Sequence, residues 1–141
     1  MATTTATITL SSFDIADNAL SISNTSTFYT AGTNTGITET TGLARKKTSS
    51  GTNTVLIEPG VANSVGADIT ADKSAKVYIK NTNDRGDGTK YVTIMILTRE
   101  IGRLYGGDWM LIPYKAASGK NLEFTAYDTT ETTLEYCVFY E

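Results

Sequence analysis

Apolar residues in the second half of the chain recur with a period of two. In "KVYIK" (76–80), Val77 and Ile79 share one face, and in "KYVTIMILT" (90–98) Val92 and Ile94 do the same. The runs "NLEFTAY" (121–127) and "TLEYCVFYE" (133–141) alternate in the same way, and all four are rich in the β-branched and aromatic residues that strands prefer. The pattern predicts four half-buried β-strands.

Turn-forming segments separate these runs. "NTNDRGDGTK" (81–90) lies between the first two, and the short "YDTTETT" (127–133) joins the last two, which predicts an antiparallel hairpin over 121–140. "IGRLYGGDWMLIPYK" (101–115) predicts a strand or tight turn at 101–105 and a strand at 108–112. Proline has no amide hydrogen, so Pro113 is expected at the end of that strand or on a sheet edge.

The first half has a weaker pattern, with candidate strands at 6–10, 20–23, 27–30, 37–48 and 53–58. The connection from 58 to 76 lacks the apolar periodicity of a long helix. Many short strands without helices predict an all-β fold, an antiparallel, jelly-roll-like β-sandwich in a single domain over 1–141. Residues 1–6, "MATTTA", are interpreted either as a frayed terminus or as a short flexible N-terminal arm that orders on a neighbouring subunit.

Charge excludes some partners. The formal net charge is -3, so no basic surface is expected to neutralise a run of phosphates, and nucleic acid is not an expected partner. The one basic cluster is Arg45, Lys46 and Lys47, which is either a solvated strand end or a contact for an acidic protein surface.

The chain has no apolar stretch near the roughly 20 residues that span a bilayer, and its start lacks the pattern of a signal peptide. We therefore expect a soluble protein that is not exported by the usual signal, with no membrane partner. Cys137 is the single cysteine, which fits synthesis in a reducing compartment and predicts a buried, inert thiol in "EYCVFY".

The residues that enzymes commonly use are scarce. The absence of histidine excludes Ser-His-Asp and Cys-His systems, and one cysteine cannot build a structural zinc site. No spacing selects an acid pair among Asp108, Glu123, Glu131 and Glu135. A non-enzymatic protein without cofactor or metal is predicted.

The loop 81–90 leaves other interpretations open besides a turn built from turn-forming residues. Its Asn83, Asp84 and Asp87 could form an irregular calcium site, although the EF-hand pattern fails. The tripeptide Arg85-Gly86-Asp87 resembles an adhesive motif.

Aromatic residues crowd the last third, and tyrosine occurs eight times in the chain. Trp109 and Tyr136 are predicted to lie in the core, and Tyr114 at the surface. The alternative is that Tyr105, Trp109 and Tyr114 form a stacking platform for carbohydrate. Together with the basic cluster, the candidate interaction surface consists of Arg45, Lys46, Lys47, Tyr105, Trp109 and Tyr114.

The segment "IGRLYGGDWMLIPYKAASGKNLEFTAYDTTETTLEYCVFYE" (101–141) resembles the C-terminal part of small virion proteins of tailed bacteriophages, and "KVYIKNTNDRGDGTKYVTIMI" (76–96) is similar to their preceding strand-loop-strand. The resemblance covers residues 75–141. It implies a virion structural protein, in particular a capsid decoration (cement) protein made in the host cytoplasm. Its terminal arm and edge strands would engage the major capsid protein, and its copies would form a closed homo-oligomer such as a trimer. The alternative is a carbohydrate- or receptor-binding tail or fibre domain.

Overall fold

Antiparallel β-strands account for the regular structure of the chain. The computed structural model describes residues 3–13, 20–48, 51–69, 74–86, 88–127 and 131–141, and none of these is helical. The predicted all-β class is therefore confirmed. Contacts divide the chain into two compact units, residues 1–38 and 39–141, referred to below as unit 1 and unit 2.

The described residues form no helix that is long and apolar enough to cross a membrane.

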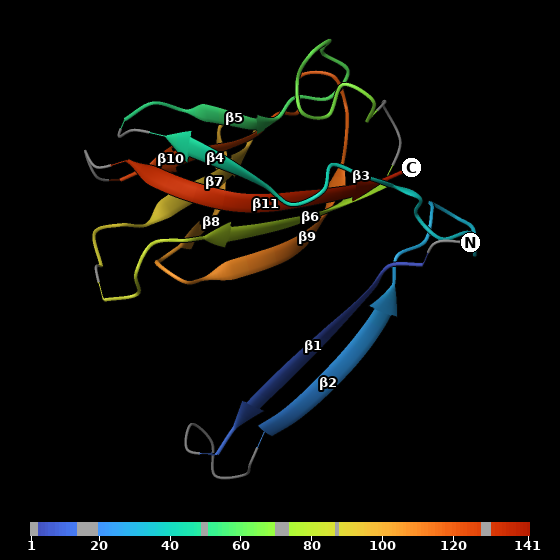
Figure 1. Cartoon of the computed structure of the whole chain (residues 1–141), viewed down its shortest axis with the longest axis horizontal. Coiled ribbons are helices and arrows are strands. Elements are labelled where there is room, and N and C mark those ends of the chain that lie inside the picture. The colour runs from blue at the N-terminus through green and yellow to red at the C-terminus, as the bar shows by residue number, and fades with distance from the viewer. Residues whose placement is uncertain (1–2, 14–19, 49–50, 70–73, 87, 128–130) are drawn as a thin grey trace. The chain divides into compact units, whose positions relative to one another are not determined.

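Unit 1 is built on a long hairpin of β1 (Thr5–Ser12) and β2 (Leu20–Thr27), drawn in blue in Figure 1. The two strands pair without a register shift from Thr5↔Thr27 to Ser12↔Leu20. Backbone hydrogen bonds extend the pairing, because Phe28 donates to the Thr4 carbonyl and accepts from the Ile37 amide. The side chains of Phe28 and Ile37 are buried.

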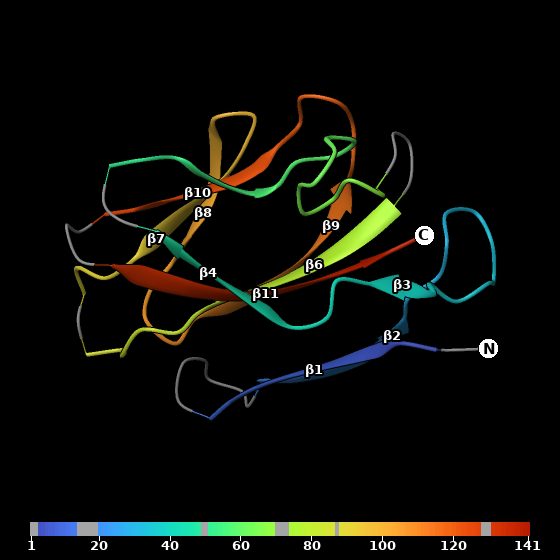
Figure 2. The same cartoon turned by 45° about the horizontal axis from the view of Figure 1, so that its top comes forward.

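Unit 2 contains two sheets (Figures 1 and 2). In the first, the strand order is β5-β10-β7-β8, with β5 at Thr54–Ile57, β10 at Leu122–Ala126, β7 at Val92–Ile96 and β8 at Arg99–Leu104. In the second, the order is β3-β11-β6-β9, and β4 also pairs with β11; β3 is Glu39–Thr40, β4 Ala44–Thr48, β6 Ser74–Asn81, β9 Trp109–Lys115 and β11 Thr132–Tyr140.

The two sheets of unit 2 share one hydrophobic core. Val77 of β6 and Val138 of β11 belong to the same buried cluster as Ile94 of β7 and Phe124 of β10. The alternation read from the sequence puts these residues on the inner faces, so the arrangement is sandwich-like (Figure 2). The strand order is compatible with a jelly roll, which remains a prediction, as does the single domain over 1–141.

The predicted hairpin over 121–140 is wrong. β10 pairs with β5 and β7, whereas β11 pairs with β3, β4 and β6 in the other sheet. A five-residue connection extends up to about 16 Å, and packed sheets lie about 10 Å apart. The short link therefore suffices to pass from one sheet to the other, and its length does not distinguish a crossing from a turn.

Pro113 lies within β9 and not at its end. β9 is at the edge of its sheet, with β6 as its one neighbour among the described strands. An edge strand tolerates the missing amide hydrogen, so the edge interpretation of Pro113 is the correct one.

Candidate interaction surface

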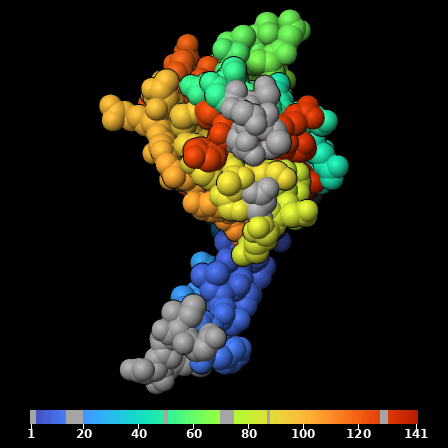
Figure 3. Space-filling model, turned by 90° about the vertical axis from the view of Figure 1, so that its left-hand side faces the viewer, coloured from blue at the N-terminus to red at the C-terminus, as the bar shows by residue number. Residues whose placement is uncertain are grey.

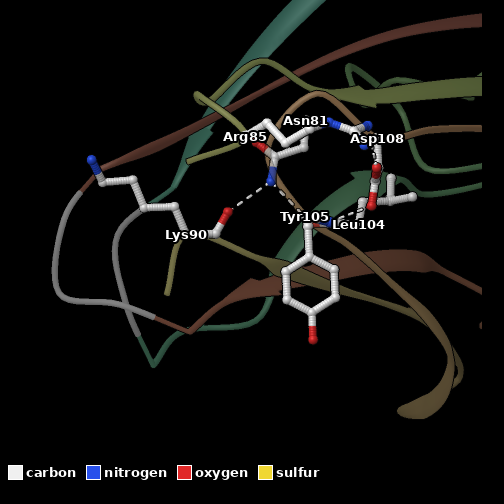
Figure 4. Close-up of polar contacts among 6 residues, drawn as sticks. All are labelled: Asn81, Arg85, Lys90, Leu104, Tyr105 and Asp108. Atoms are coloured by element: carbon white, nitrogen blue, oxygen red, sulfur yellow. Dashed lines mark hydrogen bonds and ion pairs between the residues drawn. The ribbon is translucent and has the colours of Figure 1, made fainter. Parts of the chain in front are cut away.

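Asn81, at the end of β6, is a polar residue between two loops, the β6–β7 connection and the β8–β9 turn. Its side chain is completely buried, and its Nδ2 donates to the carbonyls of Lys90 and Leu104, both at 2.9 Å (Figure 4). Its Oδ1 accepts from the backbone amide of Asn83 at 3.1 Å. A buried amide costs free energy unless it is hydrogen-bonded, and here these three bonds tie the loops together.

The turn between β8 and β9 packs on the loop that follows β6. A Cβ on Gly106 would lie 2.1 Å from the carbonyl oxygen of Asp84, so only glycine fits there. Asp108 closes the turn by accepting from the Tyr105 amide at 3.0 Å and from the Arg85 guanidinium at 2.9 Å (Figure 4). These contacts fix the backbone that carries Tyr105.

Three tyrosines and an arginine meet on the outer face of the β10-β7-β8 part of the first sheet. The rings of Tyr91 and Tyr127 stack with centroids 4.6 Å apart, and Tyr91 and Tyr105 tilt against each other at 5.4 Å. The Arg103 guanidinium lies 4.9 Å from the centroid of the Tyr91 ring. We call Tyr91, Arg103, Tyr105 and Tyr127 the tyrosine cluster.

The strand order explains the tyrosine cluster. Val92 pairs with both Ala126 and Leu104, and these three residues face the core. Each tyrosine is one position away from one of them, so it points outward. Tyr127 and Tyr105 remain 63% and 44% exposed, which leaves ring surface available to a ligand or partner.

Arg103 is held in place from its own strand. Its Nε donates to Glu100 Oε1 at 2.9 Å, and this hydrogen bond raises the pKa of Arg103 further above its usual value. The side chain therefore stays cationic over the face of Tyr91, which is an arrangement that cation–π attraction favours.

Trp109 lies outside the core, so the core prediction is wrong. It is 50% exposed. Met110 and Ile112 pack against the core, and because side chains alternate along β9, Trp109 lies on the opposite, outer face. Its ring lies 6.4 Å from that of Tyr78 on the outer face of the other sheet. Trp109 is therefore an exposed aromatic on a different sheet from the tyrosine cluster.

Tyr114 was expected at the surface and is instead buried, with 3% of it exposed. Its hydroxyl donates to the Lys120 carbonyl at 2.5 Å, and burial raises the pKa of Tyr114 to about 12. It shares the inner face of β9 with Ile112, two positions before it. The predicted platform of Tyr105, Trp109 and Tyr114 is therefore not assembled. The core prediction is confirmed for Tyr136, and Cys137 is buried as expected.

The basic cluster lies on β4, where Arg45, Lys46 and Lys47 are exposed. Arg45 pairs with Glu135 at 3.3 Å and Lys47 with Glu131 at 3.2 Å, across the β4–β11 pair. Lys46 lines a pocket with residues that include Leu56, Glu58 and Val65. These ion pairs use part of the positive charge, and both interpretations of the basic cluster, a solvated strand end and a contact for an acidic protein surface, stay predictions.

Three of the four carboxylates considered as possible acid pairs form ion pairs with basic side chains. Asp108 forms an ion pair with Arg85, and Glu131 and Glu135 form ion pairs with basic side chains of β4. In the part of the chain that the structure describes, no three His, Cys, Asp or Glu side chains are grouped so that they could hold a metal ion. Asp87, part of both the calcium and the adhesive interpretations, lies outside the described residues.

The hairpin of unit 1 offers a second surface. The sequence analysis predicted only a short N-terminal arm or a frayed terminus in this part of the chain. Thr5 and Ala6 are already part of β1 and pair with Thr27 and Ser26, while Met1 and Ala2 lie outside the described residues. One face of the hairpin is apolar and exposed, with Leu10 and Ile22 opposite each other.

No protein-family model, curated protein or solved structure matches this chain. The resemblance to virion proteins therefore stays a prediction.

Proposed function

We propose that this protein is a non-enzymatic structural subunit of a phage virion, and in particular a decoration protein that binds the major capsid protein on the outside of the assembled capsid. The observation that carries the proposal is the tyrosine cluster. Tyrosine and arginine are enriched among the residues that dominate protein–protein binding energy, and here four such side chains converge at one sheet.

The fold supports the proposal by analogy. The strand orders β5-β10-β7-β8 and β4-β11-β6-β9 fit a jelly roll, and jelly rolls occur in viral capsid proteins and in lectins. A fold by itself does not define a function, so the experiment has to test binding through the tyrosine cluster.

The test is binding to particles. Purified protein is added to intact particles of the virus that encodes it, prepared without this protein, and the bound fraction is measured by co-sedimentation. We expect saturable binding that Tyr127→Ala weakens at least tenfold, as loss of a hot-spot side chain does. Trp109→Ala is the matched control, because it removes an exposed aromatic of the other sheet. If the wild-type protein does not bind the particles, the decoration role is overturned.

The second candidate function is carbohydrate or receptor binding in a tail or fibre, and the same tyrosine cluster favours it. Exposed tyrosine rings present flat apolar faces with a polar rim, which suits stacking against a sugar. Tyr105 and Tyr127 replace Trp109 and Tyr114 in this version of the platform.

Glycan-array binding distinguishes the two functions. If the second candidate is correct, the wild-type protein binds a defined glycan, Tyr127→Ala and Tyr105→Ala lose that binding, and Trp109→Ala keeps it. A protein that binds particles and no glycan favours decoration, whereas binding to glycans without binding to particles favours the receptor-binding role.

A further inference from the structure

We infer that the apolar face of the β1–β2 hairpin is an interface between copies of this chain. The register places Leu10 opposite Ile22, with Ile8 and Leu20 on the same face. These four side chains are 36–53% exposed, although large aliphatic residues usually lie inside. Asn24 lies opposite Ile8 and Ser12 opposite Leu20, so the apolar stripe runs diagonally across the two strands.

The opposite face of the hairpin carries hydroxyl groups. The paired hydroxyls of Thr7 and Thr25 are 2.9 Å apart, and those of Thr9 and Ser23 are 3.4 Å apart. That face is suited to water, so only the apolar face calls for a covering layer. A two-stranded hairpin by itself is marginally stable in water, and a second layer on its apolar face would stabilise it.

A second copy of the chain fits this face because the two strands carry no charge. None of the residues 3–13 and 20–27 is acidic or basic. Across a two-fold axis the same patch of each copy meets the other, and on these strands it would juxtapose no like charges. A partner that recognises charge would find no complementary group here.

The unprotected edges of the hairpin also favour a second copy as the partner. Within the described residues β1 and β2 pair only with each other, and their register has no bulge. Neither strand contains the lysine or proline that commonly protects an exposed edge. The hairpin, blue in Figure 3, is therefore a two-stranded sheet with two unpaired edges among the described residues.

The area of the hairpin face determines how strongly we expect two copies to associate. The hairpin has eight paired positions. At about 3.4 Å per residue and about 10 Å for two strands, each copy offers a footprint of roughly 270 Å². Stable interfaces bury about 800 Å² per partner, so we expect association in the micromolar range.

The experiment is sedimentation equilibrium of the full chain over about 1–300 µM, a range that brackets micromolar affinity. The wild-type mass should rise with concentration from 15.1 kDa to a multiple of it. Ile22→Asp should weaken association at least tenfold, because it places a charge on the apolar face. Ser23→Asp is the matched control: it adds the same charge one residue away, on the hydroxyl face, and should associate like the wild type.

Leu10→Thr is the milder variant, since threonine keeps a strand-favouring side chain and removes only the apolar contact. It should also weaken association while the far-ultraviolet circular dichroism stays that of the wild type. A wild-type protein that remains monomeric over the whole range overturns the inference, whether the face is covered by another protein or by its own chain. Equal dissociation of Ile22→Asp and Ser23→Asp overturns the assignment of the face. None of these outcomes depends on capsid binding, so the inference and the decoration role can fail separately.

Discussion

Gly106 is the residue whose side chain the fold most clearly forbids. A Cβ there would meet the carbonyl oxygen of Asp84 at 2.1 Å, and backbone atoms cannot move aside cheaply. We expect Gly106→Ala to lower the free energy of unfolding by about 1–3 kcal/mol, as overpacking does, measured by urea denaturation. Gly86→Ala is the control, because its Cβ would meet open space. Equal effects of the two substitutions would contradict the close approach of the two loops.

Tyr114 links stability to pH at the alkaline end. Burial raises its pKa to about 12 in the folded protein, against about 10 in an unfolded chain. A raised pKa means that the folded state holds its proton longer, so the associated stability is fully present below pH 10 and is lost as the pH rises to about 12. Burial acts in the same direction on the pKa of Tyr136.

We therefore expect the free energy of unfolding to fall between about pH 10 and 12, and to fall less steeply in Tyr114→Phe, because phenylalanine has no proton to lose. Urea denaturation at a series of pH values measures both slopes. Tyr127→Phe, at an exposed ring, serves as the control and should keep the wild-type slope. Parallel curves for wild type and Tyr114→Phe would show that this hydroxyl is not what links stability to pH.

Among the elements, the β7–β8 hairpin has an unfavourable turn. Ile96 pairs with Arg99, so Leu97 and Thr98 are its two central residues, and both have positive φ, of 52° and 62°. Two-residue hairpins of this kind favour Asn-Gly, and a β-branched residue at positive φ is strained. The double substitution Leu97→Asn/Thr98→Gly should therefore stabilise the protein by about 1–2 kcal/mol.

Thermal and urea unfolding of this double variant provide the measurement. Ser118→Gly is a suitable control, because it adds glycine to another turn at a residue without positive φ and should give no gain. A loss of stability in the double variant would mean that Leu97 or Thr98 makes contacts that outweigh the backbone strain.

The sequence predicts those strands whose apolar residues alternate along the chain, and it does not predict which strands pair with each other. β6, β7, β10 and β11 follow from their period-two pattern, because each places a buried row on one face. The partners of β10 and β11 could not be predicted, since a short link serves a turn and a sheet crossing equally. The positions of Trp109 and Tyr114 were missed because β9 is apolar on both faces, and alternation alone did not say which row is inside.

The tyrosine cluster was missed for a related reason. Tyr91 and Tyr127 lie 36 residues apart and meet only because β7 and β10 are neighbours. The available signal was their position next to Val92 and Ala126, which predicts outward rings but not their meeting. Tyr105, which was part of the predicted surface, is the member that the sequence identified.

At the scale of the whole molecule, the two proposed surfaces are expected to act together. If the hairpin joins copies and the tyrosine cluster binds the particle, each oligomer attaches through several clusters. The second contact is then intramolecular, and the apparent affinity can exceed that of one site by about 10²–10⁴. An oligomer could therefore decorate the capsid tightly although each tyrosine cluster binds the particle only weakly.

Ile22→Asp tests the coupling, because it should dissociate the oligomer and leave the tyrosine cluster of unit 2 intact. At a concentration where the wild type is oligomeric, its apparent affinity for particles should fall by about 100-fold, mainly through faster dissociation, whereas Ser23→Asp should bind like the wild type. Binding isotherms and dissociation time courses on particles measure this. An Ile22→Asp protein that is monomeric and still binds as tightly as the wild type would show that attachment needs only one copy. The hairpin would then serve assembly without contributing to capsid affinity.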